Sequence, residues 1–149
     1  MQHAWIAALF MLPAIAHELM PPSTPPHHAP GGADRVLEQA STLLRRTMKT
    51  LERTSDTASA DKSAEALNAF LAESKPLWLK LEELDLVTDG WFSTDPSLSG
   101  NAAWERFKDD MGSFSRCLMQ YDAICSASHY FGSTKLRQAM KQFFVPRRP

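Results

Sequence analysis

The chain has 149 residues, of which 44% are hydrophobic and 22% charged, and its formal net charge is −1. This length suits one domain, and the composition is that of a globular protein rather than of a disordered or wholly membrane-spanning chain. The near-neutral balance argues against a nucleic-acid partner, and two cysteines are too few for a disulfide scaffold.

The first feature along the chain is an uncharged apolar run, AWIAALFMLPAIA, from Ala4 to Ala16. It is shorter than the roughly 20 residues that a membrane-spanning helix needs, but it has the length of a signal-peptide core. Ala14-Ile15-Ala16 supplies the small residues that precede a cleavage site. We therefore predict a signal peptide at 1–16 and export to the periplasm or the extracellular space, with no integral membrane segment after cleavage. The alternative is a buried N-terminal helix, since no Lys or Arg precedes the run.

Residues 17–33 follow as a predicted tether. Its core, PPSTPPHHAPGG, contains five prolines and two glycines in twelve residues. Proline removes a backbone donor and glycine costs backbone entropy, so the segment is expected to be disordered. His17, His27 and His28 lack the fixed geometry that a metal site requires, and we expect no metal there.

The remaining residues, 34–149, are predicted to form one helical domain. Apolar residues recur every three or four positions from about Asp34 to Thr54 and again from about Ala60 to Leu84, as in helices that face a core. Ser59 is the expected N-cap of the second helix. Pro76 interrupts that helix, and we expect a kink there or two helices that meet.

A connection without helical periodicity, DLVTDGWFSTDPSLSGN, spans Asp85 to Asn101. Trp91 and Phe92 lie at its centre. Two large aromatic side chains on a loop either fold back over the core as a lid or bind a partner, and the lid is the simpler interpretation.

The third helix has the most regular pattern in the chain, and we expect Asn101 to cap its start. Its apolar residues alternate spacings of three and four without a fault: Trp104, Phe107, Met111, Phe114, Leu118, Tyr121 and Cys125. Such a seam requires facing helices. A last helix is predicted from Ser133 to about Val145, ended by Pro146.

Four such helices joined by turns bury one another best as an antiparallel four-helix bundle, so the fold class is predicted to be all-α. The order of elements from Asp34 to Val145 resembles that of cytochrome b562-type bundles. The turn at 56–61 and the alanine-leucine face after it resemble a hairpin of uncharacterised exported bacterial helical proteins.

The b562 resemblance implies haem held by a methionine of the first helix and a histidine of the last. Here Met48 lies near the end of the first helix, and the last helix has no histidine, since His129 precedes it. The Cys-x-x-Cys-His sequence of covalent haem attachment and the Glu-x-x-His pair of di-metal bundles are also absent. We therefore expect no cofactor and no metal.

A nucleophilic enzyme is not indicated either. Cys125 with His129 is the nearest Cys/His grouping, but Cys125 continues the apolar seam and is expected to be a buried structural residue. Cys117 and Cys125 stand eight residues apart, about 12 Å along a helix, which is too far for a disulfide in an intact helix.

Charge is unevenly distributed, with twelve acidic and five basic side chains in 56–110 but six basic and one acidic in 111–149. We expect these surfaces to attract each other across the bundle, although Arg147 and Arg148 could instead bind an acidic partner. The sequence thus favours an exported, non-enzymatic bundle that binds a protein or cell-envelope component, through a helix face or through Trp91, Phe92, Arg147 and Arg148. The alternative is a small-ligand carrier or sensor with an interhelical pocket near Pro76.

Overall fold

The computed structural model describes residues 30–88 and 91–144. Four α-helices hold most of these residues, which confirms the all-α prediction: α2 (Pro30–Leu51), α3 (Thr57–Glu83), α4 (Ala102–Ala127) and α5 (Thr134–Phe144). The shorter elements are the strands β1 (Val87–Thr88) and β2 (Trp91–Phe92) and the 3₁₀ helices η1 (Pro96–Leu98) and η2 (His129–Gly132). The expected signal peptide at 1–16, most of the tether, and Arg147 and Arg148 lie outside the described residues.

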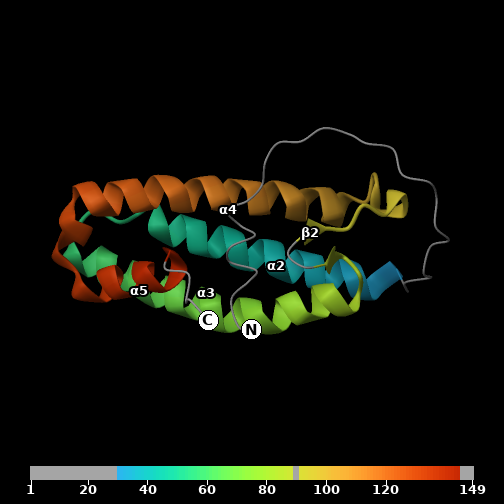
Figure 1. The fold of residues 1–149 in the computed structure, drawn as a ribbon, viewed down its shortest axis with the longest axis horizontal. Helices are drawn as coiled ribbons and strands as arrows, with labels where there is room; N and C mark the ends of the chain where they lie inside the picture. Colours follow the sequence, from blue (N-terminus) through green and yellow to red (C-terminus); the bar gives the residue numbers. More distant parts are fainter. Residues whose placement is uncertain (1–29, 89–90, 145–149) are drawn as a thin grey trace.

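The bundle is built around α2, which packs against α3 on one side and α4 on the other. The short helix α5 lies against the first half of α3 (Figure 1). Connections between successive long helices lie at alternate ends of the molecule (Figure 1). Beyond the end of α5, the segment between α3 and α4 covers the core with the buried side chains of Leu86 and Val87.

The apolar seam of the third predicted helix is confirmed in α4, where all seven of its residues are buried. Asn101 caps the start of α4, since its side-chain Oδ1 accepts a hydrogen bond of 2.9 Å from the backbone N–H of Trp104. Phe114 of α4 stacks on Phe70 of α3 with ring centroids 4.6 Å apart. The aromatic positions of the seam therefore form the centre of the core.

Several predicted boundaries need correction. The first helix begins at Pro30 rather than Asp34, so residues 30–33 of the expected tether are helical. Proline is favoured in a first helical turn, because the N–H it lacks would have no intrahelical acceptor there. The helix also ends at Leu51 rather than Thr54.

The second helix begins at Thr57, three residues before the predicted Ala60, and its N-cap is Asp56 rather than Ser59. Asp56 Oδ1 accepts from Ser59 N at 2.7 Å, and Ser59 Oγ in turn accepts from Asp56 N at 3.0 Å. Ser59 thus has the N3 role of a capping box. The helix then continues through Pro76 to Glu83 as one element, so two separate helices do not meet there.

The connection from Asp85 to Asn101 is more ordered than predicted. Val87 pairs with Phe92 and Thr88 with Trp91 in a small antiparallel ladder. The intervening sequence Asp89-Gly90 is a dipeptide favoured in two-residue hairpin turns, so a recognisable signal was present.

Candidate functional site

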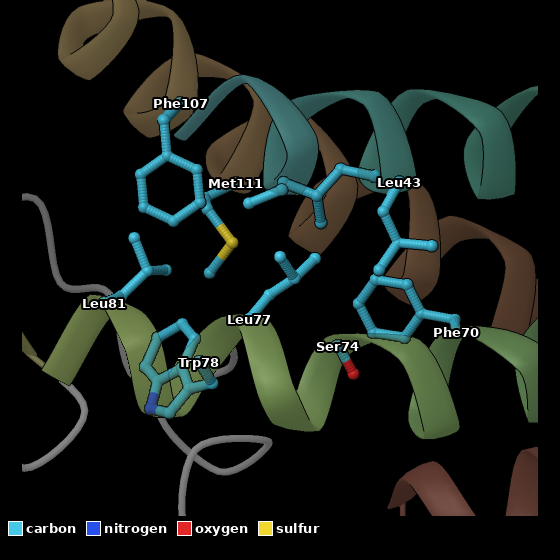
Figure 2. Close-up of a pocket in the computed structure, with 10 residues that line it drawn as sticks. Leu43, Phe70, Ser74, Leu77, Trp78, Leu81, Phe107 and Met111 are labelled. Atoms are coloured by element: carbon cyan, nitrogen blue, oxygen red, sulfur yellow. The ribbon is translucent and has the colours of Figure 1, made fainter. Parts of the chain in front are cut away.

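A small apolar cavity lies between α2, α3 and α4, and Ser74 and Leu77, on either side of Pro76 in the sequence, line it. Its volume is about 30 Å³. Figure 2 shows Leu43 of α2, Met111 and Phe107 of α4, and Leu77 and Trp78 of α3 around it. Ser74 contributes a hydroxyl that donates to the carbonyl of Leu71 at 3.4 Å. This is the interhelical space that the small-ligand hypothesis places near Pro76, and its volume is that of about one water molecule.

A much larger open groove, the α2–α3 groove, lies on the outer side of α2 and α3. Its volume is about 650 Å³. Its rims are charged and polar and its floor is apolar. It is lined by Arg35, Glu38, Gln39, Thr42, Leu43, Arg46, Glu73, Pro76, Leu77 and Lys80.

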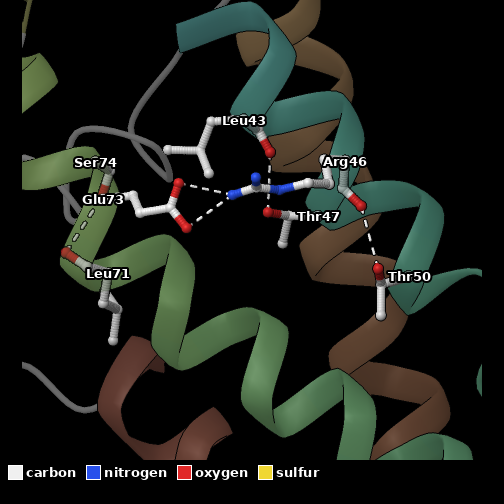
Figure 3. Close-up of polar contacts among 7 residues, drawn as sticks. All are labelled: Leu43, Arg46, Thr47, Thr50, Leu71, Glu73 and Ser74. Carbon is white, nitrogen blue, oxygen red and sulfur yellow. Dashed lines mark hydrogen bonds and ion pairs between the residues drawn. The ribbon is translucent and has the colours of Figure 1, made fainter. Parts of the chain in front are cut away.

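One ion pair spans the α2–α3 groove. Arg46 Nη2 donates to both carboxylate oxygens of Glu73, at 2.7 and 2.8 Å (Figure 3). Nearby hydroxyls bond within their own helix: Thr47 Oγ1 donates to Leu43 O at 2.9 Å and Thr50 Oγ1 to Arg46 O at 3.2 Å. The Arg46 guanidinium is therefore bonded to a neighbouring helix, whereas the Thr47 and Thr50 hydroxyls bond within α2.

Leu43 and Leu77 line both the cavity and the α2–α3 groove. Leu43 is buried and Leu77 half-buried. These two side chains lie between the apolar interior and the charged rims of the groove. The floor of the groove is therefore apolar and continuous with the core.

A second groove lies between the end of α2 and the middle of α4. It has a volume of about 330 Å³ and includes Met48, Thr54, Cys117, Tyr121 and Ile124. Tyr121 Oη lies 2.9 Å from Thr54 Oγ1, which lies 2.7 Å from Ser63 Oγ, so one hydroxyl chain joins α4 to α3 through the residues that follow α2. Ile124 is 53% exposed at its rim.

The thiols of α4 are poor nucleophiles in this setting. Burial raises the pKa of the Cys117 thiol, and the Glu52 carboxylate raises it further. Burial raises the pKa of Cys125 to about 11. Because the thiolate is the reactive form, both effects oppose nucleophilic chemistry. Both cysteines are free within an unbroken α4, as the predicted spacing requires.

The ion pair at the far side of α2 is partly sheltered. Arg45 Nε donates to Asp110 Oδ1 at 3.0 Å, and Arg45 Nη2 lies 2.8 Å from Asp110 Oδ2. This hydrogen bond and the carboxylate charge raise the pKa of Arg45. This contact between one carboxylate and one guanidinium orients α2 against α4.

Of the four predicted partner-binding residues, only Phe92 has a side chain among those that the structure describes. The half-buried Phe92 packs edge-on against Trp104 and Phe107, with ring centroids 5.7 and 5.9 Å away. Trp91 pairs through its backbone with Thr88, and its side chain lies outside the described part of the chain. Phe92 therefore occupies the position expected of a lid residue.

The least usual backbone lies at the α4–α5 junction. His129, Tyr130, Phe131 and Gly132 have φ values of 51°, 58°, 52° and 75°, which form a left-handed turn of four residues. A left-handed conformation costs a residue other than glycine roughly 1–2 kcal/mol, so three in succession store strain. Apart from Gly132, these residue types do not predict such a turn, because His, Tyr and Phe do not favour this region.

Within residues 30–88 and 91–144, no three His, Cys, Asp or Glu side chains gather closely enough to hold a metal ion. Among the same residues, no helix combines the length and apolarity needed to cross a membrane. In comparisons with protein-family models, with curated proteins and with solved structures, no match to this chain was found.

Proposed function

We propose that this chain is an exported, non-enzymatic helical bundle that binds a protein or a cell-envelope component through the α2–α3 groove. The observation that carries the proposal is the contrast between the two spaces on either side of Leu43 and Leu77. The inner cavity has a volume of about 30 Å³, whereas the outer groove has about 650 Å³. Small-molecule pockets are typically about 300–1,000 Å³, so the inner cavity is too small to hold a ligand and the open groove is the larger binding surface.

The groove's chemistry fits a macromolecular partner. Its floor offers apolar contact at Leu77 and Pro76, while Arg35 and Lys80 are exposed cations on its rims. An apolar centre with a polar rim is the usual arrangement of a protein-binding surface. The alternative function, a small-ligand carrier, would require the inner cavity to enlarge about tenfold.

The proposal includes the finer architecture. The helices would alternate in direction as an antiparallel bundle. The short connection 52–56 joins α2 to α3, which pack together, and 128–133 returns the chain from α4 so that α5 packs on α3. The helix α3 would bend at Pro76, since proline cannot donate to the carbonyl of Ala72. Such a bend supports the proposal by widening the outer groove where Pro76 lines it.

The test is affinity capture of the mature protein from its native envelope, with one groove variant and one matched control. Lys80→Glu reverses a charge in the groove, and Lys75→Glu makes the same change on an exposed part of α3 outside it. Five residues separate them, so they point about 140° apart on the helix. We expect a partner captured by the wild type and by Lys75→Glu to be lost with Lys80→Glu. Equal capture by all three would reject the groove as the binding surface.

Export is tested on the same material. N-terminal sequencing of the mature chain is expected to begin at His17. Recovery of the intact N-terminus from the cytoplasm would contradict the signal-peptide interpretation.

A further inference from the structure

The turn that joins α4 to α5 is held against its own backbone preference. Three consecutive residues with side chains, His129, Tyr130 and Phe131, adopt positive φ values before Gly132. Two backbone hydrogen bonds close the turn, from Phe131 N to Ser128 O at 3.1 Å and from Ser133 N to Tyr130 O at 2.8 Å. Strained backbone persists only where its surroundings over-determine it, so the restraints around this turn decide its conformation.

Those restraints come from the first turns of α3. Thr57 Oγ1 donates to the carbonyl of Phe131 at 2.6 Å. Asp61 accepts a hydrogen bond from Ser133 Oγ and lies 3.6 Å from Lys135 Nζ. The contacts of Asp61 with Ser133 and Lys135, the Asp61 clamp, join α3 to the start of α5 and would be the same if α5 belonged to another molecule. The bond from Thr57 to Phe131 belongs to the closed turn.

The helix α5 also depends on α3. It has 11 residues, and it buries Leu136, Ala139, Met140 and Phe143. Phe143 lies 6.0 Å from Phe70 of α3, measured between ring centroids. A helix of this length is not stable alone in water, so α5 needs a surface such as α3 wherever it goes.

We propose that α5 exchanges between two copies of this chain, with residues 128–133 as the hinge. In the swapped dimer, α5 of each copy would pack on α3 of the other and would keep the Phe70 contact and the Asp61 clamp. The opened hinge would release the left-handed turn, which exists only in the closed form. Short hinges under strain favour exchange of this kind, and identical elements make it a low-cost route to dimers.

The experiment uses the ion pair between Lys135 and Asp61 as a reporter. A zero-length carbodiimide couples an amine to a carboxylate in contact, and it would join these side chains in the monomer within one chain and in the swapped dimer between chains. Dimer is isolated by size-exclusion chromatography from a mixture of ¹⁴N- and ¹⁵N-labelled protein refolded together at high concentration. We expect mixed-isotope Asp61–Lys135 peptides in the dimer, and their absence on Asp61→Asn substitution.

Two hinge variants change the equilibrium in opposite directions. His129→Gly relieves the closed turn and weakens an opened helical hinge, so it should raise the dimer dissociation constant by about tenfold for each hinge, or about a hundredfold in all. Gly132→Ala places a side chain at a φ of 75° and should lower that constant. A protein that remains monomeric at high concentration, a dimer whose crosslinks stay within one chain, or variants that leave the constant unchanged would each overturn the proposal.

Discussion

At the scale of single residues, the start of α3 shows how one side chain fixes a chain reversal. Asp56 Oδ1 accepts from both the backbone N–H and the hydroxyl of Ser59, at 2.7 and 2.6 Å. The Ser59 hydroxyl also accepts from the N–H groups of Ser55 and Asp56, at 2.9 and 3.0 Å. The backbone N–H groups of Ser55, Asp56 and Ser59 are therefore all satisfied by side chains of this one turn.

Because the cap uses the Asp56 carboxylate, the stability of the fold should depend on pH in the acidic range. The hydrogen bonds from the Ser59 side chain and backbone lower the pKa of Asp56. A carboxylate with a lowered pKa stabilises the folded state above its unfolded pKa of about 3.9, and that contribution is lost as the pH falls through the folded value. We expect Asp56→Ala to lower the melting temperature at neutral pH and to have progressively less effect as the pH falls below about 4.

The matched control is Asp56→Asn, which keeps an oxygen acceptor without a titrating group. Melting temperatures from circular dichroism across the acidic range should show the difference between wild type and Asp56→Ala shrinking, while Asp56→Asn tracks the pH dependence of the remaining groups. A constant difference between wild type and Asp56→Ala would show that the carboxylate charge contributes nothing.

The position of this cap was only partly predictable. The sequence Ser55-Asp56-Thr57-Ala58-Ser59 offers four residues that can cap a helix, and propensity alone does not choose among them. The structure selects Asp56, with Ser59 three residues later as its reciprocal partner. Thr57 is thereby left in the first turn, where its hydroxyl donates to the carbonyl of Phe131 in η2.

At the scale of elements, periodicity predicted α4 well because every third or fourth residue there faces helices on more than one side. Phe107, Phe114 and Leu118 are each at most 1% exposed. The connection between α3 and α4 was predicted less well, since Leu86 and Val87 are buried in too short a run to show a period. The left-handed η2 turn could not be predicted at all, because contacts with α3 impose it on residues that disfavour it.

The helix α3 carries a further test, because Pro76 lies inside it and is exposed. Proline in a helix interior removes one hydrogen bond and crowds the carbonyl four residues earlier, at a cost of about 3 kcal/mol. Part of this is offset because proline also restricts the unfolded chain, by about 0.4–1 kcal/mol. We expect Pro76→Ala to raise the free energy of unfolding by about 2–2.6 kcal/mol, measured by urea denaturation.

Lys75→Ala is the control, since it changes an exposed neighbour on α3 without restoring a backbone donor. It should alter stability by no more than a few tenths of a kcal/mol. If Pro76→Ala destabilises the protein instead, the packing of Leu77 and Trp78 requires the bend that we propose for α3.

At the scale of the whole molecule, the core of the bundle is covered although the fourth helix, α5, is short. The helix α5 has 11 residues against the 27 of α3, and the β1–β2 segment covers the core beyond it. A helix, α5, and the β1–β2 segment therefore together form the fourth side of the bundle. Within residues 30–88 and 91–144 the four predicted helices are present, but the prediction did not anticipate that β1 and β2 would complete the fourth side beyond α5.

The reactivity of the two thiols of α4 reports how readily the helices of the bundle separate. Cys125 is 0% exposed with a pKa of about 11, whereas Cys117 is half-buried beside the groove between α2 and α4. A thiol-specific reagent should therefore label Cys117 first under native conditions and reach Cys125 only when the surrounding helices open. We expect the labelling rate of Cys125 to rise with urea concentration much more steeply than that of Cys117, because its exposure requires more surface to be uncovered.

Cys117→Ala and Cys125→Ala variants isolate each rate, and mass spectrometry of the denatured, unreduced wild type should count two labels. Two labels follow from the geometry, since an unbroken α4 holds the cysteines eight residues apart along one rod. Equal native rates at both thiols would mean that the end of α4 next to η2 opens as readily as its surface groove. In that case the α4–α5 junction would be open in the isolated chain, and the clamp between Asp61, Ser133 and Lys135 would not govern its conformation.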